Sequence, residues 1–150
     1  MSLSYYSNVE VQKEILKSAK FKEVAIRYGE KGFGKRPDTL HYESDVIELA
    51  KQGATSFHIS EEHWTNPQSL TPGMTKKQLE TLRRGWDFIL DIDSPNLEHS
   101  KWIAHFLIQA LKFHNTKNIS LKFSGNKGFH IGVPFESFPS KIKEVETKTL

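Results

Sequence analysis

The chain has no cysteine among its 150 residues. This absence excludes disulfide bonds, cysteine-ligated zinc sites and a cysteine nucleophile, and it is compatible with a reducing compartment. Long apolar runs are absent too, because no stretch approaches the ~20 residues that a membrane-spanning helix needs. The segment from Met1 to Tyr6 has neither a basic region nor an apolar core, so no secretory signal is expected. We expect a cytoplasmic protein without a membrane segment.

The composition is that of a globular protein. Hydrophobic residues make up 37% of the chain, charged residues 26% and aromatic residues 11%, which excludes a disordered or fibrous chain. Lysine and arginine number 21 against 18 acidic residues, a formal net charge of +3. This mild excess permits a nucleic-acid partner without requiring one.

Predicted helices and strands alternate along the chain with no linker-like or repeated segment, which indicates a single domain over residues 1–150. Period and turn signals predict helices at 8–20, 45–53, 75–85 and 95–114, and strands at 21–28, 55–59, 86–93, 119–123 and 129–133. Asn8, Ser44 and Ser94 are the expected N-caps of the first, second and fourth helices. The segment Thr75-Lys76-Lys77-Gln78 is a capping box that predicts the start of the third. The expected buried stripe of the fourth helix is Ile103, Phe106, Leu107, Ala110, Leu111 and His114. This order favours an α/β (α+β mixed) fold, with a mixed β-sheet flanked by helices.

The strand predicted at 86–93 has one apolar and one acidic face. Leu90 and Ile92 share one side, and Asp91 and Asp93 share the other, because successive side chains of a strand alternate. Two carboxylates placed this way can bind Mg²⁺ or Mn²⁺, which prefer hard oxygen ligands. The alternative is that Asp93 starts a turn and Asp91 is merely solvent exposed.

The two C-terminal strands form a predicted hairpin whose turn is the segment Ser124-Gly125-Asn126-Lys127-Gly128-Phe129-His130. Alternation places Lys122, Ser124 and His130 on the face opposite the apolar side chains. Glycines that admit a ligand to the backbone, a lysine, a hydroxyl and an imidazole together suit a triphosphate. The alternative is a hairpin turn with a half-exposed histidine.

The loop at 29–38 combines three glycines with Lys31, Lys35 and Arg36. Such a loop can be a flexible basic arm that contacts phosphates or nucleic acid, or a solvated connection. Glu23, in the strand before it, is expected on the polar face of that strand.

Taken in this order, the motifs resemble those of the catalytic (small) subunit of archaeal and eukaryotic DNA primases. Asp91-Ile92-Asp93 is similar to that family's hydrophobic-Asp-x-Asp metal motif, and the segment from Ser124 to His130 is similar to its Ser-Gly-x-x-Gly-x-His nucleotide motif. Phe21-Lys22-Glu23 stands where the family has an Arg-Glu-Phe-type segment. The resemblance runs from about Tyr5 to Pro139.

The resemblance implies template-directed synthesis of RNA or DNA primers on single-stranded DNA, from NTPs or dNTPs, by a two-metal mechanism. Asp91 and Asp93 would hold the Mg²⁺ or Mn²⁺ ions, and Glu23 would be an auxiliary acid. The residues that would contact the incoming triphosphate are Ser124, Lys127, His130 and Arg36. A primase large subunit is an implied partner, and the implied location is an archaeal-type cytoplasm, beside the nucleoid.

The chain departs from the primase pattern in two ways. The family's third metal-binding aspartate, which follows the second motif, has no counterpart here, and neither does its cysteine and histidine zinc motif. We therefore expect the N-terminal part of a primase catalytic core, or a reduced relative, that binds nucleotide but is incomplete for synthesis. The alternatives are the polymerase domain of bacterial end-joining repair ligases, whose second motif is also similar, and a non-catalytic nucleotide- or nucleic-acid-binding module.

Overall fold

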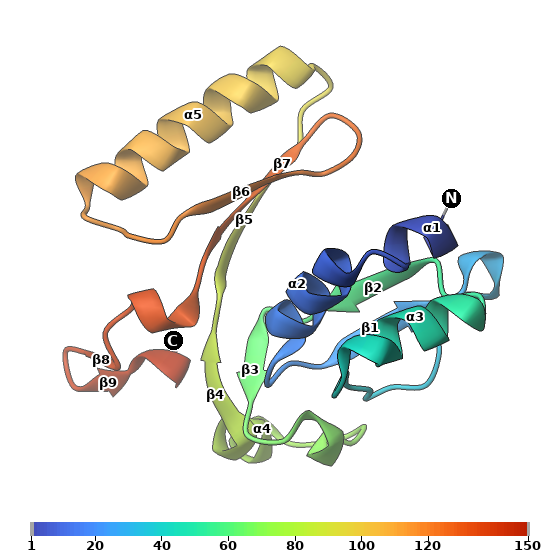
Figure 1. The fold of residues 1–150 in the computed structure, drawn as a ribbon. Helices are drawn as coiled ribbons and strands as arrows, with labels where there is room; N and C mark the ends of the chain where they lie inside the picture. Colours follow the sequence, from blue (N-terminus) through green and yellow to red (C-terminus); the bar gives the residue numbers. More distant parts are fainter. Residues whose placement is uncertain (1, 150) are drawn as a thin grey trace. The chain divides into compact units, whose positions relative to one another are not determined.

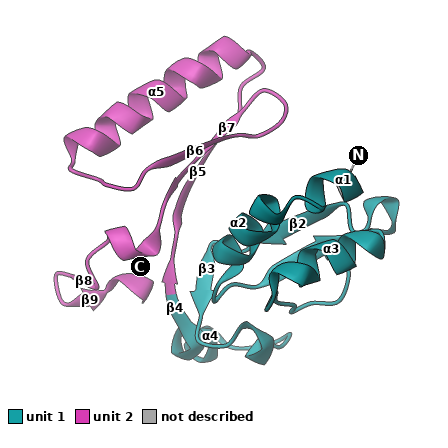
Figure 2. Cartoon of the chain, in the orientation of Figure 1, with its two compact units in different colours: residues 1–84 teal, residues 85–150 magenta. Residues whose placement is uncertain are grey.

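The computed structural model describes residues 2–149, which form helices and small antiparallel sheets, a mixed α/β fold as the sequence predicts (Figure 1). The chain divides into two compact units, residues 1–84 and 85–150, where the sequence predicts a single domain (Figure 2). Within residues 2–149, the strands form three two-stranded sheets and one three-stranded sheet in place of the single sheet that the sequence predicts. The three-stranded sheet and two of the two-stranded sheets are antiparallel.

The first unit is built from helices that pack on a two-stranded sheet. Its elements are α1 (Ser2–Tyr6), α2 (Val9–Ala19), β1 (Val24–Arg27), α3 (Glu43–Lys51), β2 (Ser56–Ile59), β3 (Glu62–Trp64) and α4 (Lys76–Leu82), and β4 (Arg83–Trp86) crosses into the second unit. Figure 1 shows α2 and α3 over the β1–β2 pair. Val24, Ile26 and Val46 are buried between these layers, with Tyr6 and Ala50. Burial of each large apolar side chain contributes about 1.5–3 kcal/mol.

In the first unit, the helix caps agree with the sequence at two helices and differ at one. The Asn8 side chain accepts a hydrogen bond from the Glu10 amide at the start of α2, and Thr75 and Gln78 form the predicted capping box of α4. Ser44 is not the N-cap of α3. The helix begins two residues earlier than predicted, at Glu43, because the Asp45 carboxylate accepts hydrogen bonds from the amides of His41 and Tyr42, and a charged acceptor makes the stronger cap.

Strands β3 and β4 occupy segments that the sequence predicts as loop and as the end of a helix. They form a two-stranded sheet. The Arg83 guanidinium lies 2.6 Å from the Glu62 carboxylate and 5.2 Å from the centre of the buried Trp64 ring. A three-residue strand is too short to give a periodic signal, and the partner that makes Arg83 a strand residue is distant in sequence.

The second unit contains a three-stranded antiparallel sheet in the order β5-β7-β6. Its elements are β5 (Phe88–Ile92), α5 (Leu97–Phe113), β6 (Ser120–Phe123), β7 (Phe129–Val133), β8 (Lys141–Ile142) and β9 (Val145–Glu146). Ile92, Ala104 and Ile131 are the buried centre of the layer between α5 and one face of this sheet. The predicted hairpin is confirmed, since β6 and β7 pair antiparallel around residues 124–128.

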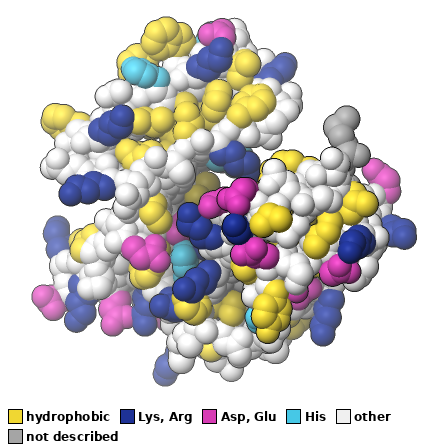
Figure 3. Space-filling view, viewed as in Figure 1, with side chains coloured by type: hydrophobic (Ala, Val, Ile, Leu, Met, Phe, Trp, Pro, Cys, Tyr) yellow, Lys and Arg dark blue, Asp and Glu magenta, His cyan; other side chains and the backbone are white. Residues whose placement is uncertain are grey.

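Helix α5 differs from the prediction in its N-cap and in which of its side chains are buried. Its N-cap is Asn96, whose side chain accepts from the Glu98 amide, so Ser94 is not the cap. Ser100 and Ala104 are buried, whereas Phe106 is 64% exposed. Of the predicted stripe, Leu107 and Leu111 pack against the core, whereas Ile103, Phe106, Ala110 and His114 are exposed. The small side chains of Ser100 and Ala104 let the helix approach the sheet closely. Figure 3 shows hydrophobic side chains gathered on the outer surface of α5.

Among residues 2–149, no helix has the length and apolar character needed to cross a membrane.

Candidate functional site

The register of the three-stranded sheet aligns polar side chains from three strands. Asp91 of β5 lies opposite His130 of β7, and His130 lies opposite Lys122 of β6. Directly opposed residues in antiparallel strands project to the same face. Because the neighbouring apolar residues pack toward α5, Asp91, His130 and Lys122 occupy the other face. We call these three residues the polar row.

Within the polar row, Asp91 and His130 are in contact. The Asp91 Oδ1 and His130 Nε2 atoms are 3.3 Å apart. The Asp91 side chain remains 66% exposed, so its carboxylate is open to a ligand from solvent. This placement confirms the predicted alternation of Asp91 with Ile92, which is buried against α5.

Asp93 lies against the glycine that closes the nucleotide-motif loop. A Cβ atom placed on Gly128 would be 2.5 Å from Asp93 Oδ1, 2.3 Å from the Ile92 carbonyl oxygen and 3.1 Å from Ser124 Oγ. Only glycine leaves room for these groups. The two motifs therefore meet in one place, and the contact depends on the missing side chain at residue 128.

The 124–128 loop is held by its own hydrogen bonds. The Ser124 amide donates to the Gly128 carbonyl oxygen (2.9 Å), and the Gly128 amide donates to Ser124 Oγ (3.1 Å). Gly125 has a φ of 96°, which favours glycine. The sequence suggests that the Gly128 amide is open to a ligand; here it is engaged within the loop. The Ser124 hydroxyl only accepts in this bond, so its proton is available to a ligand.

Ser100 is a residue of the site that the sequence does not single out. It is fully buried on α5, and its hydroxyl donates to the Lys127 carbonyl oxygen at 2.6 Å. This bond fixes the tip of the 124–128 loop to the helix, while the Lys127 side chain stays exposed. Ser100 precedes Ala104 by four residues, so the two lie on the same side of the helix, the side that faces the sheet. This spacing is the sequence signal that could have identified Ser100.

The structure brings together the sequence-predicted residues of the second unit. Asp91, Asp93, Ser124 and His130 lie on one face of the sheet and its loop, and Lys127 belongs to the same loop. Glu23 and Arg36 belong to the first unit, where they contact one another.

Glu23 and Arg36 form a bidentate ion pair. Arg36 Nε donates to Glu23 Oε1 (2.7 Å) and Arg36 Nη2 donates to Oε2 (2.8 Å). The hydrogen bond that Arg36 donates to Glu23, and then the negative charge of Glu23, raise the pKa of the Arg36 guanidinium above its ordinary value. The Glu23 side chain is only 13% exposed. Its carboxylate already has a cationic partner, so a metal ion would have to displace Arg36 from it.

The 29–38 loop is ordered rather than a free arm. The Gly34 amide donates to the Ile26 carbonyl oxygen, and Phe33 bridges to Arg27 of β1. A pocket of about 340 Å³ lies beside the Glu23–Arg36 pair, with Phe33 and His58 in its wall. The loop thereby presents Arg36 from a defined position.

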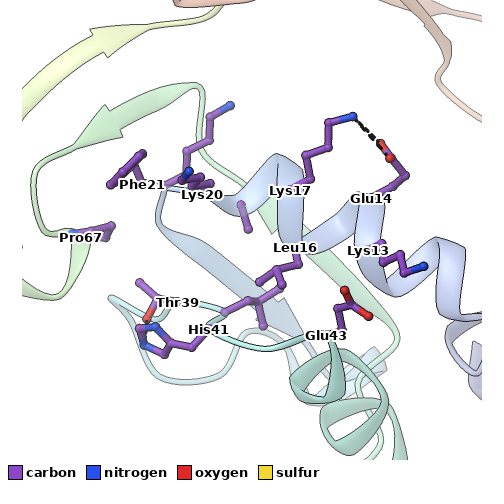
Figure 4. Close-up of a pocket in the computed structure, with 13 residues that line it drawn as sticks. Lys13, Glu14, Leu16, Lys17, Lys20, Phe21, Thr39, His41, Glu43 and Pro67 are labelled. Carbon is purple, nitrogen blue, oxygen red and sulfur yellow. Dashed lines mark hydrogen bonds and ion pairs between the residues drawn. The ribbon is translucent and has the colours of Figure 1, made fainter.

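A larger cavity in the first unit, of about 690 Å³, is lined by α2, Phe21 and residues 39–43 (Figure 4). Its floor is apolar, with Leu16 and Leu40, and lysines stand at its edge. Lys17 pairs with Glu14 at 3.4 Å, as Figure 4 shows, and Lys13 pairs with Glu10 at 2.9 Å. These carboxylates offset much of the positive charge around the cavity.

The donor set of the second unit suits a hard divalent cation. Asp91 and Asp93 provide exposed carboxylate oxygens, the ligands that Mg²⁺ and Mn²⁺ prefer. No group of three or more histidine and acidic residues with metal-binding geometry is found within residues 2–149. Two carboxylates cannot fill an octahedral shell, so water and ligand phosphates would have to supply the remaining oxygens.

Comparison with known proteins gives a short match. No protein-family model matches the chain. An uncharacterized protein of Methanocaldococcus jannaschii is 41% identical over 58 residues, which are 38% of this chain and 13% of that relative. The chain is thus similar to a small part of a longer archaeal protein.

Proposed function

We propose that the chain is part of a nucleotidyltransferase of the DNA primase type, which binds a nucleoside triphosphate on the open face of the β5-β7-β6 sheet. The observation that carries this proposal is the strand register. It sets Asp91 opposite His130, and directly after the paired residues Asp93 lies beside Gly128, so two motifs that are separated by a whole helix come together. If the Asp-x-Asp segment and the glycine turn had unrelated roles, nothing would require them to lie next to one another.

Each residue has a role that its geometry allows. The proton of the Ser124 hydroxyl is free to be donated to a phosphate oxygen, because the hydroxyl accepts from Gly128 within the loop. The His130 ring lies 3.3 Å from the carboxylate of Asp91, and His130 is paired with Lys122 on the neighbouring strand. Asp91 and Asp93 would hold the divalent cations, which when bound neutralise phosphate charge and activate the attacking hydroxyl. Lys127 adds positive charge at the loop tip.

Arg36 is proposed as a further phosphate contact and Glu23 as the group that positions it. A guanidinium has five N–H donors, and Glu23 takes two of them. The remaining donors suit a phosphate. We propose single-stranded DNA as template, NTPs or dNTPs as substrates, a primase large subunit as partner and a cytoplasmic location beside the nucleoid.

A second candidate is a nucleotide-binding module without turnover. The finding that favours it is the lack, within residues 2–149, of a metal-binding group with three or more histidine or acidic ligands. Two-metal catalysis depends on the positions of both ions in the transition state, whereas ground-state binding needs less. The end-joining polymerase alternative shares Lys127 in its motif and would extend an existing 3′ end rather than start a new strand.

The direct test is ATP binding by the wild-type chain and by His130→Ala and Ser124→Ala, with Mn²⁺ present. Loss of a charge-assisted hydrogen bond should weaken binding about tenfold or more. Circular dichroism must show that each variant is folded. Unchanged affinity in both folded variants would contradict the proposal. Synthesis without a primer, compared with extension of a primer, then separates the primase from the repair polymerase.

A further inference from the structure

The open face of the β5-β7-β6 sheet is electrically polarised along the polar row. At the β5 end stand Asp91 and Asp93, both exposed. At the β6 end stands Lys122, also exposed, with His130 between them. Three adjacent strands span two strand spacings, about 10 Å. The face therefore changes from negative to positive over the length of a small ligand.

This polarity suits a ligand that carries cations at one end and uncompensated negative charge at the other. A metal-bound nucleoside triphosphate is such a ligand, because the divalent cation neutralises only part of its charge. The carboxylates of β5 attract the cation-bound end, and repel phosphate oxygens that carry no cation. The free negative charge is drawn to the β6 end of the polar row.

Lys122 is well placed to receive that charge. In the part of the chain described here, its ammonium group pairs with no carboxylate. Its backbone belongs to a strand whose register with β7 is fixed on both sides of the residue, by Leu121 opposite Ile131 and by Phe123 opposite Phe129. A side chain on such an element is placed more precisely than one on a loop tip such as Lys127.

On the other face of the sheet, the packing holds this orientation in place. The Phe123 and Phe129 rings pack with their centres 5.5 Å apart, and Phe129 contacts the α5 core. Because side chains alternate, Phe123 on that face keeps Lys122 on the open face. A shift of one residue in the β6 register would move Phe123 away from Phe129 and the lysine away from His130.

We infer that Lys122 is the residue that makes this site selective for a nucleoside triphosphate over a nucleoside monophosphate, by contacting the terminal phosphate at the β6 end of the polar row. The inference rests on the proposed function, since it assumes that nucleotide binds to this face. Asp91, Ser124 and His130 serve the cation and the phosphate next to the nucleoside, which both ligands carry. Lys122 serves the part that only the triphosphate has.

The experiment compares ATP and AMP binding, by calorimetry with Mn²⁺, for the wild type, Lys122→Gln, Lys122→Arg and Lys117→Gln. Lys117 precedes β6 and is exposed, so Lys117→Gln makes the same change of charge in the same unit outside the polar row. Lys122→Gln should bind ATP about tenfold more weakly than the wild type, with AMP affinity unchanged. Lys122→Arg should restore ATP binding, and the loss in Lys122→Gln should shrink at high salt.

Two results would overturn the inference and leave the proposed function intact: ATP affinity in Lys122→Gln equal to that of Lys117→Gln while His130→Ala abolishes binding, or equal losses of ATP and AMP affinity in Lys122→Gln. A wild-type chain that binds neither nucleotide, in a preparation whose circular dichroism shows it folded, overturns both the inference and the proposed function.

Discussion

The acidic residues of the candidate site differ between the two units in how fully they are paired within the chain. In the first unit, the nearly buried Glu23 carboxylate is bound at both oxygens by Arg36. In the second, Asp91 is mostly exposed and has a single 3.3 Å contact with His130, and Asp93 is exposed beside Gly128. Groups whose hydrogen bonds are complete within the chain hold other groups in place, whereas groups left open are available to a ligand. The contrast assigns positioning to Glu23 and ligand binding to Asp91 and Asp93.

The largest effect is expected from Gly128→Ala, which disrupts the contact between Asp93 and the 124–128 loop. A Cβ atom would lie 2.3 Å from the Ile92 carbonyl oxygen and 2.5 Å from Asp93 Oδ1, so strand β5 or the loop must move. We expect a loss of about 1–3 kcal/mol of stability together with loss of Mn²⁺ binding. Urea denaturation and Mn²⁺ calorimetry measure the two effects.

Gly73→Ala is the matched control. Gly73 has a φ of 84° but no atom within 4 Å of an added Cβ, so only its backbone conformation is penalised, by about 1 kcal/mol. Mn²⁺ affinity in Gly128→Ala equal to that in Gly73→Ala would show that Asp93 does not depend on this contact.

Glu23→Gln tests the ion pair between Glu23 and Arg36 in the first unit. It removes a charge-assisted, bidentate acceptor from Arg36, which should cost about 1.5–3 kcal/mol, reduced because Arg36 is partly exposed to solvent. If Glu23 positions Arg36 and does not bind metal, Mn²⁺ affinity should be unchanged. Denaturation and Mn²⁺ calorimetry on the same variant decide this, and a large loss of Mn²⁺ affinity with stability retained would assign Glu23 to the metal site.

Ser100→Ala is expected to have the smallest effect, and it tests whether α5 holds the 124–128 loop in place. It removes the 2.6 Å bond that fixes the Lys127 carbonyl, at a cost of about 1 kcal/mol, and it releases the tip of the 124–128 loop. ATP affinity should fall severalfold, whereas Mn²⁺ affinity should be retained. Ser120→Ala, whose hydroxyl bonds the Gly132 carbonyl instead, should leave ATP affinity unchanged; equal losses in both variants would remove the special role of Ser100.

The predictable parts of the molecule are those with strong local signals. Strict alternation in 119–133 predicts the hairpin, and alternation around Asp91 predicts its open face. The capping box of α4 and Asn8 mark helix starts, because each start depends on hydrogen bonds between residues only two or three positions apart. The resemblance to primases stays a prediction that nucleotide binding must test.

The parts that the sequence did not predict depend on distant partners. Strand β4 requires β3 as its partner, and the buried side of α5 is chosen by how closely Ser100 and Ala104 can approach the sheet. The sequence has no linker-like segment at the boundary between the two units, near residues 84 and 85. The role of Gly128 follows from Asp93, which is remote in sequence and becomes a neighbour only through strand pairing.

The most direct test of the account is paramagnetic NMR with Mn²⁺ on the ¹⁵N-labelled chain. If Asp91 and Asp93 bind the ion, Mn²⁺ should selectively broaden the signals of His130 and Gly128, which lie beside them. It should spare the amide of Phe113, which ends α5 about 24 Å along the helix from Leu97. The broadening should disappear in Asp91→Ala/Asp93→Ala. Broadening that persists in this double variant, or that is absent from His130 and Gly128 in the wild type, would contradict it.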